Sequence, residues 1–235
     1  MRFNELSAEP VPYHDELNPI LWQDNKLKTE IRYKLLFIAK HFANFLNVSK
    51  LNLKDITISG SNAAYGYTDS SDLDLHLIAD IPKDRTELIE LYDAKKNQYN
   101  SKFDIKIKTI PVELYVQSST QPHTSAGIYS VLYDYWIKEP KHQAPKVSDE
   151  EVKSKARNYA GRLNRALRSD DLKLSVETMD DIRRLRQAGL ESGGEFSIEN
   201  LAFKLLRARG QIDKLRKHID KLQSAELSIG EKHEN

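Results

Sequence analysis

Two aspartates stand one residue apart inside an otherwise apolar stretch, DLDLHLIAD, which spans residues 72–80. Side chains of a β-strand alternate between faces, so Asp72 and Asp74 would share one face, about 6.5 to 7 Å apart along the strand. Burying carboxylates is costly unless a positive partner compensates them. Hard cations such as Mg²⁺ prefer oxygen ligands, and they commonly take one or two carboxylates together with phosphate oxygens and water. The spacing therefore predicts a divalent-metal site.

A Gly-Ser pair follows a short predicted strand just upstream of the aspartates. Gly60 allows the backbone to approach a phosphate closely, while the hydroxyl and amide groups of Ser61 are hydrogen-bond donors. If a helical turn follows in residues 62–67, its N-terminus adds a favourable dipole for the same anion. A phosphate site beside a metal site favours phosphoryl chemistry, in which two ions roughly 3.5 to 4 Å apart stabilise the attacking and leaving oxygens.

The motifs occur in a particular order: Gly60-Ser61, a gap of about ten residues, Asp72-Leu73-Asp74-Leu75, and later Val112-Glu113-Leu114. Over roughly residues 31–117, this order resembles the signature of the nucleotidyltransferase superfamily that includes DNA polymerase β. The whole chain also resembles the predicted nucleotidyltransferases common in tailed-phage genomes. The segments that carry this second resemblance are LNPILWQDNKLKTEIRYKLLFIA, SDLDLHLIAD, FDIKIK, PVELYVQ and PHTSAGIYSVL.

The resemblance implies that Asp72 and Asp74 bind Mg²⁺ or Mn²⁺, and that Glu113 is a further metal ligand or a general base toward an acceptor hydroxyl. It also implies that Gly60 and Ser61 hold the β and γ phosphates of a nucleoside triphosphate. Glu113 stands where many relatives have Asp, a change that preserves metal binding. No arginine follows the Gly-Ser pair closely, unlike in aminoglycoside-modifying and small antitoxin-type relatives, so neither substrate class is transferred to this chain.

Three further residues are predicted to contact the nucleotide. Tyr67 would stack on a base or sugar, Ser71 lies directly before the aspartates, and Lys106 would neutralise triphosphate charge. Structural alternatives remain open, because the tyrosine could pack within the turn and the lysine could belong to a solvated strand face. His76, on the acidic face, would contact a phosphate, orient Asp74 or form an ordinary hydrogen bond.

The hydrophobic periodicity predicts an α+β fold: a small mixed nucleotidyltransferase-type sheet flanked by helices, followed by an all-helical C-terminal domain. We expect an N-terminal arm over 1–25, an α/β domain over 26–140, a helical domain over 148–225 and a flexible tail over 226–235. The predicted helices are 26–46, 83–100, 149–168, 174–188 and 198–222, and the predicted strands are 51–59, 72–80, 103–108 and 112–117.

The helical domain is expected to begin with a capping box, because Glu151 follows Ser148 by three residues. Arginines are dense in this domain. They would either line a groove for the phosphates of an RNA or DNA acceptor or form helix surfaces with interleaved acids. The arginines concerned are Arg157, Arg162, Arg165, Arg168, Arg183, Arg184, Arg186, Arg207 and Arg209.

Composition excludes several classes of function. Lysine and arginine (36) nearly balance aspartate and glutamate (35), so the whole molecule is not expected to bind polyanions indiscriminately. The absence of cysteine excludes disulfides, thiolate zinc sites and cysteine nucleophiles. Without a signal-peptide pattern or an apolar run near the ~20 residues of a membrane span, we expect a cytoplasmic protein, located in the host cytoplasm if it is phage-encoded.

Together these features predict a metal-dependent nucleotidyltransferase that moves a nucleoside monophosphate from an NTP to an acceptor hydroxyl and releases pyrophosphate. The acceptor is left open among RNA such as tRNA, a protein and a small molecule. The alternative is a non-catalytic nucleotide-binding or nucleic-acid-binding protein, or a structural phage protein, that retains the fold.

Overall fold

The computed structural model describes residues 13–47, 52–69, 71–82, 85–121, 123, 125–142 and 147–229 of the chain. These residues divide into two compact units, an α/β unit formed by the described residues up to 142 and a helical unit formed by those from 147 onward.

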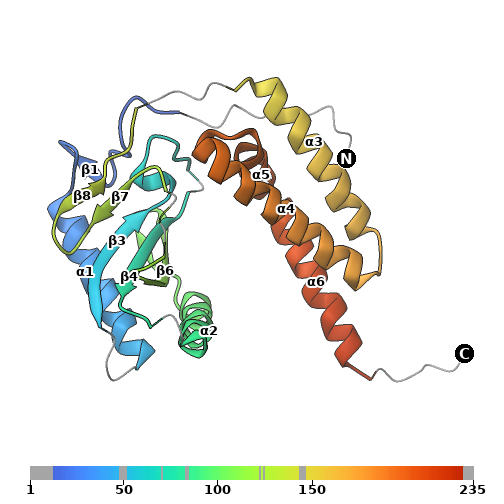
Figure 1. The fold of residues 1–235 in the computed structure, drawn as a ribbon, viewed down its shortest axis with the longest axis horizontal. Coiled ribbons are helices and arrows are strands. Elements are labelled where there is room, and N and C mark those ends of the chain that lie inside the picture. The colour runs from blue at the N-terminus through green and yellow to red at the C-terminus, as the bar shows by residue number, and fades with distance from the viewer. Residues whose placement is uncertain are drawn as a thin grey trace, which may run out of the picture. The chain divides into compact units, whose positions relative to one another are not determined.

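A six-stranded sheet with the strand order β5-β6-β4-β3-β7-β8 forms the centre of the α/β unit (Figure 1). Strands β4 and β6 run parallel and the other neighbouring pairs are antiparallel, so the sheet is mixed. A separate two-stranded hairpin precedes the first helix. The strands are β1 (Trp22–Gln23), β2 (Lys26–Leu27), β3 (Leu53–Ser59), β4 (Leu73–Ala79), β5 (Lys106–Ile107), β6 (Ile110–Ser118), β7 (Ile128–Ser130) and β8 (Tyr135–Lys138).

One face of the sheet is apolar and packs against helices α1 (Thr29–Leu46) and α2 (Thr86–Lys102). In β4 the leucines at 73, 75 and 77 are fully buried, and they alternate with half-buried polar or charged positions. The apolar stripe of α1, which includes Leu35 and Phe42, meets Tyr99 of α2 in the same core. The opposite face of β4 therefore presents Asp74 and His76.

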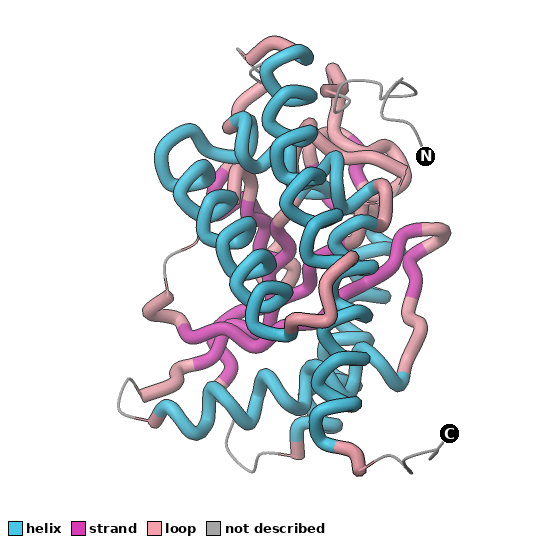
Figure 2. Tube along the Cα trace, turned by 90° about the vertical axis from the view of Figure 1, so that its right-hand side faces the viewer, coloured by secondary structure: helices cyan, strands magenta, loops and turns pink. Residues whose placement is uncertain are grey.

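The helical unit contains α3 (Asp149–Leu167), α4 (Leu172–Gly193), α5 (Ile198–Ala208) and α6 (Gln211–Leu227) around its own apolar core. Figure 2 shows the helices of both units in cyan and the strands in magenta. The predicted capping box is confirmed, because Ser148 Oγ accepts from the Glu151 N–H while the Glu151 carboxylate accepts from the Ser148 N–H. Within the described ranges, no helix has both the length and the apolar character needed to cross a membrane. The predicted α+β class, with a mixed sheet followed by helices, is confirmed.

Several predicted boundaries are wrong for local reasons. The predicted helix 198–222 is two helices, because Gly210 adopts a left-handed φ of +66° and starts a new helix after α5. The first helix begins at Thr29 rather than at residue 26, since Lys26 and Leu27 pair with β1. The predicted strand 103–108 shrinks to β5, where Lys108 turns the chain with a φ of +56°.

The edge formed by β7 and β8 is the part of the sheet that the periodicity does not reveal. These short strands come from an aromatic-rich segment, in which Trp136 stacks on Trp22 at 4.6 Å between ring centres. Trp22 and Leu21 are almost completely buried, so residues that sequence patterning assigned to an arm supply core contacts. The N-terminal segment therefore packs against the loop between β3 and β4, which contains Asn62.

Candidate metal and nucleotide site

Three carboxylates meet at one end of the sheet. Asp74 of β4 is directly opposite Glu113 of β6 in the parallel register, which places both side chains on the same face. One carboxylate oxygen of each of Asp72, Asp74 and Glu113 lies within 4.8 Å of the others, and all three side chains are half-buried. The structure therefore brings together the acidic residues that the sequence separates by about forty positions.

Asp72 reaches this cluster from outside the strand. The predicted strand 72–80 is one residue too long at its start, because β4 begins at Leu73. The alternation argument therefore does not position Asp72, and a loop interaction must do so. The backbone carbonyl of Asp72 accepts a hydrogen bond of 2.8 Å from the side chain of Asn62.

Asn62 is the central residue of this loop and is completely buried. Its amide donates to the carbonyls of both Ser71 and Asp72, while its Oδ1 accepts from Asn18 at 2.8 Å. Its own backbone carbonyl accepts from the Trp22 indole at 2.7 Å. Because buried polar groups are costly when left unpaired, this set of bonds favours one conformation of the chain just before the acidic cluster.

Gly60 occupies a position that no other residue fits without strain. Its φ is +80° and its ψ is −165°, a combination that is essentially restricted to glycine. A Cβ built there would lie 2.2 Å from the Asp74 carboxylate oxygen Oδ2. The glycine thus permits both the turn out of β3 and the close approach of this backbone to the acidic cluster.

The serine hydroxyls of the loop are linked to each other. Ser61 begins a short 3-10 turn that ends at Ala63, and its Oγ donates to Ser71 Oγ at 2.9 Å. The Thr68 N–H also donates to Ser71 Oγ at 2.9 Å. Ser61 and Ser71 are therefore brought together beside the acids, in hydrogen bonds that close the loop.

Glu113 is held by a neighbouring aromatic residue. The Tyr115 hydroxyl donates to Glu113 Oε2 at 2.5 Å, and burial together with the nearby Asp74 carboxylate raises the pKa of Tyr115, so the phenol stays protonated. The Tyr115 ring stacks on His76 with 4.9 Å between centres, and the Lys96 ammonium lies 5.1 Å from the ring centre. Tyr115 thus fixes the orientation of one of the three acids.

His76 is a neutral packing and hydrogen-bonding residue in this environment. Burial, followed by the neighbouring His123, lowers the pKa of His76 to about 3. Its Nε2 lies 3.1 Å from Ser59 Oγ on the adjacent strand β3. The hydrogen-bonding alternative that the sequence left open therefore describes the observed contact.

Two of the residues predicted to contact the nucleotide make local contacts in the structure. Tyr67 stacks on His14 with 3.8 Å between ring centres and an interplanar angle of 11°, so one face of its ring is covered. Lys106 lies on the short edge strand β5 and pairs with Asp104 at 2.8 Å. These local contacts agree with the packing and pairing alternatives, and nucleotide contact by either residue stays a prediction.

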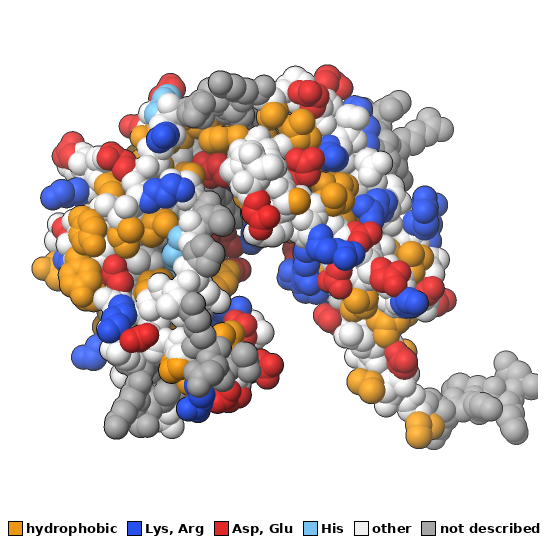
Figure 3. Space-filling view, in the orientation of Figure 1, with side chains coloured by type: hydrophobic (Ala, Val, Ile, Leu, Met, Phe, Trp, Pro, Cys, Tyr) orange, Lys and Arg blue, Asp and Glu red, His pale blue; other side chains and the backbone are white. Residues whose placement is uncertain are grey.

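Arginines of the helical unit are interleaved with acids. Asp181 pairs with both Arg162 and Arg184, and Asp180 lies 3.7 Å from Arg183. Arg186 donates to Asn200 and lies over the Phe203 ring. Blue and red side chains alternate over these helices in Figure 3, which favours the charge-paired helix surface over a uniformly basic groove.

No family model matches the sequence, and no curated protein matches it. Among solved structures, the chain is similar to one described as a STING-associated CdnE c-di-GMP synthase from Capnocytophaga granulosa. The two share 13% identity over 85% of this chain and 84% of that chain, with a TM-score of 0.26. At this level of similarity, the residues of the site carry the functional inference.

Sequence patterning identified the acids and the Gly-Ser pair but missed the residues that hold them. Asn62 gives one signal, since it directly follows Gly60-Ser61 in a turn-rich segment, where an asparagine side chain often bonds backbone groups. Tyr115 gives another, because it shares a strand face with Glu113 at a spacing of two. The contribution of the Trp22 segment had no such signal.

Proposed function

We propose that this protein is a metal-dependent nucleotidyltransferase that transfers a nucleoside monophosphate from an NTP to an acceptor hydroxyl. The observation that carries the proposal is the convergence of Asp72, Asp74 and Glu113 next to the Gly60 turn. The order of these motifs along the chain also matches the superfamily that the sequence resembles. The acceptor class and the preferred base are left to experiment.

The donor set fits Mg²⁺ or Mn²⁺. All three candidate ligands are carboxylates, which suit hard cations, and their oxygens are close enough to converge on bound ions. No cysteine is present in the sequence to favour a softer metal. When bound, the metal would polarise the phosphates and balance the charge that develops during transfer.

The protein residues would act by holding the reactants in place. Asp72 and Asp74 would hold the metal, and the Gly60 backbone together with the Ser61 hydroxyl would contact the β and γ phosphates. The acceptor oxygen bonds to the α phosphorus as the bond to the bridging oxygen breaks, and pyrophosphate leaves with that electron pair. Glu113 takes the hydroxyl proton or binds metal, with Tyr115 fixing its carboxylate. The protein thereby contributes mainly positioning and electrostatic stabilisation.

Transfer is tested with NTPs labelled at the α phosphate, Mg²⁺ or Mn²⁺, and acceptor pools of tRNA, other RNA, proteins and small alcohols. Labelled product should form with wild type and fall at least a hundredfold with Asp72→Asn or Asp74→Asn. Asp80→Asn is the matched control, because Asp80 follows the same strand but is exposed and lies near Lys54, at 3.7 Å. Its activity should equal that of wild type.

Two other outcomes would indicate a different function for the protein. NTP-dependent thermal stabilisation without labelled product from any acceptor pool would indicate a binding protein, and no stabilisation by Mg²⁺ with NTP would indicate a structural protein. Labelling that is equal in wild type and both aspartate variants would exclude these carboxylates from the reaction.

A further inference from the structure

A cavity lies on the polar face of the same sheet, near the end of β4 that is opposite the acid cluster. It has a volume of about 180 Å³ and is lined in part by Thr57 of β3 and Ile78 of β4. Ile78 follows Asp74 by four residues on the strand, which separates their Cα positions by about 13 Å. The cavity therefore extends from Thr57, which is opposite His76, toward the end of β4 that is farther from the acid cluster.

A buried hydroxyl without a partner points to a ligand here. Thr57 is only 1% exposed, and its Oγ1 forms no hydrogen bond. In the β3–β4 register Thr57 is opposite His76, so its side chain projects from the polar face rather than into the helix-covered core. Buried hydroxyls are normally paired, because an unpaired one costs about 1–3 kcal/mol.

His123, which also lines the cavity, has a buried Nε2 without a partner. Its ring is 5.4 Å from that of His76. Burial lowers the pKa of His123, so this imidazole adds a neutral polar group rather than a charge. Two residues on separate segments, each with a buried polar atom that has no partner, thus line one small space.

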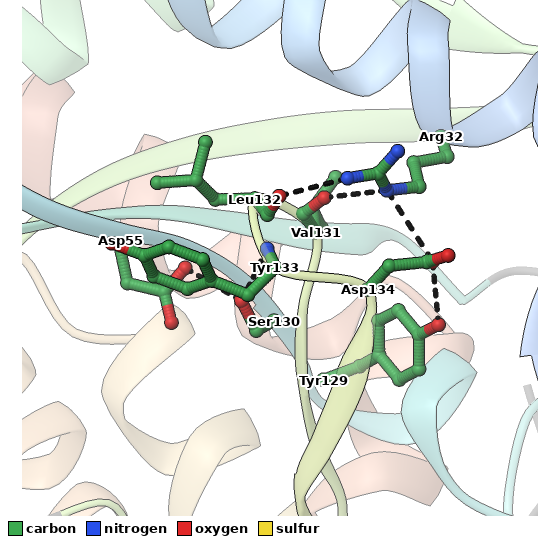
Figure 4. A network of polar contacts seen from close by, with 8 residues as sticks. All are labelled: Arg32, Asp55, Tyr129, Ser130, Val131, Leu132, Tyr133 and Asp134. Carbon is green, nitrogen blue, oxygen red and sulfur yellow. Dashed lines mark hydrogen bonds and ion pairs between the residues drawn. The ribbon is translucent and has the colours of Figure 1, made fainter.

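Asp55 supplies the anionic group of the cavity wall. It accepts from the Ser130 hydroxyl and from the Ile56 N–H, each at 2.7 Å, and Figure 4 shows it held beside Ser130. The remaining lining residues are three isoleucines, Ile78, Ile128 and Ile137, and the polar residues Ser118, Ser119 and Gln121. The cavity therefore combines an apolar surface with a hydroxyl, an imidazole and a fixed acceptor.

We propose that this cavity binds a single planar ring that carries an amino donor beside a hydrogen-bond acceptor, as an aminopyrimidine does. The volume is slightly larger than an engineered cavity of about 150 Å³ that holds benzene. The amino group would donate to Asp55, and the Thr57 hydroxyl would donate to the ring acceptor. The isoleucines would contact the ring itself. This proposal does not depend on nucleotidyl transfer.

Cytosine and uracil are matched probes, because they have the same shape but present an amine and a carbonyl, respectively, at the same ring position. With ¹³C-labelled isoleucine methyls, millimolar cytosine should shift the signals of Ile78, Ile128 and Ile137 in a saturable way. Uracil should bind at least fivefold more weakly, since its carbonyl would face the Asp55 carboxylate.

Thr57→Val removes the hydroxyl at nearly constant volume, and Thr57→Ser keeps it. Cytosine affinity should fall roughly five- to tenfold in the valine variant and change less than twofold in the serine variant. Without the probe, Thr57→Val should be at least as stable as wild type, which separates binding from folding. The proposal is overturned if the methyl signals do not respond to cytosine or if uracil shifts them equally. It is also overturned if the Thr57→Val variant binds cytosine as tightly as the wild-type protein does.

Discussion

Replacement of Gly60 by alanine tests the structural basis of the site most directly. The new Cβ would lie 2.2 Å from Asp74 Oδ2, whereas an ordinary contact needs at least 3.4 Å, so the carboxylate must move by about 1.2 Å. The backbone conformation alone costs an alanine roughly 1–3 kcal/mol. Relieving the overlap in this packed loop adds a further ~1–3 kcal/mol.

Gly194 provides a matched control for the cost of placing an alanine in this backbone conformation. Its φ of +69° and ψ of −158° are close to those of Gly60, but a Cβ built there would meet nothing within 4 Å. Urea unfolding should therefore show a loss of about 1–3 kcal/mol for Gly194→Ala and a larger loss for Gly60→Ala. The difference between the two variants measures the overlap with Asp74.

A double-mutant cycle assigns that difference to the carboxylate. In an Asp74→Ala background, Gly60→Ala should cost about 1–3 kcal/mol less than in wild type, because the atom that it displaces is gone. In the otherwise wild-type protein, Gly60→Ala should also lower transfer activity about a hundredfold, since a shift of 1 Å at a reacting centre has effects of this size. Equal losses for Gly60→Ala and Gly194→Ala, with no coupling to Asp74, would refute the reasoning.

Three further predictions follow from the contacts around the site. Asn62→Ala should lower the free energy of unfolding by about 1–3 kcal/mol and weaken Mg²⁺ binding measured by calorimetry; unchanged metal affinity would show that Asn62 does not position Asp72. Tyr115→Phe should lower kcat and leave KM nearly unchanged, because Tyr115 orients the Glu113 carboxylate. An unchanged kcat would contradict this positioning role. Asp55 has its pKa raised, mainly by burial, so its carboxylate destabilises the fold as pH rises above the unfolded value. Asp55→Asn should therefore become more stable relative to wild type between pH 3.5 and pH 7 in urea titrations, and a constant difference would exclude this linkage.

The sequence by itself determined the class of fold and identified the acidic residues on which the proposed chemistry depends. Alternation in β4 placed Asp74 on a polar face because strand side chains have a period of two, and the later acidic strand supplied Glu113. The apolar stripe of α1 and the capping box of α3 are equally local signals, read over one or two helical turns.

Only the tertiary structure decided how the acids meet. The parallel pairing of β4 with β6 is a long-range choice, and it aligns Asp74 with Glu113. Asp72 lies outside the strand and is positioned through Asn62, whose bonds reach back to Asn18 and the Trp22 segment. Contacts between residues so far apart leave no periodic trace in the chain, because each depends on packing that forms only when the segments fold together.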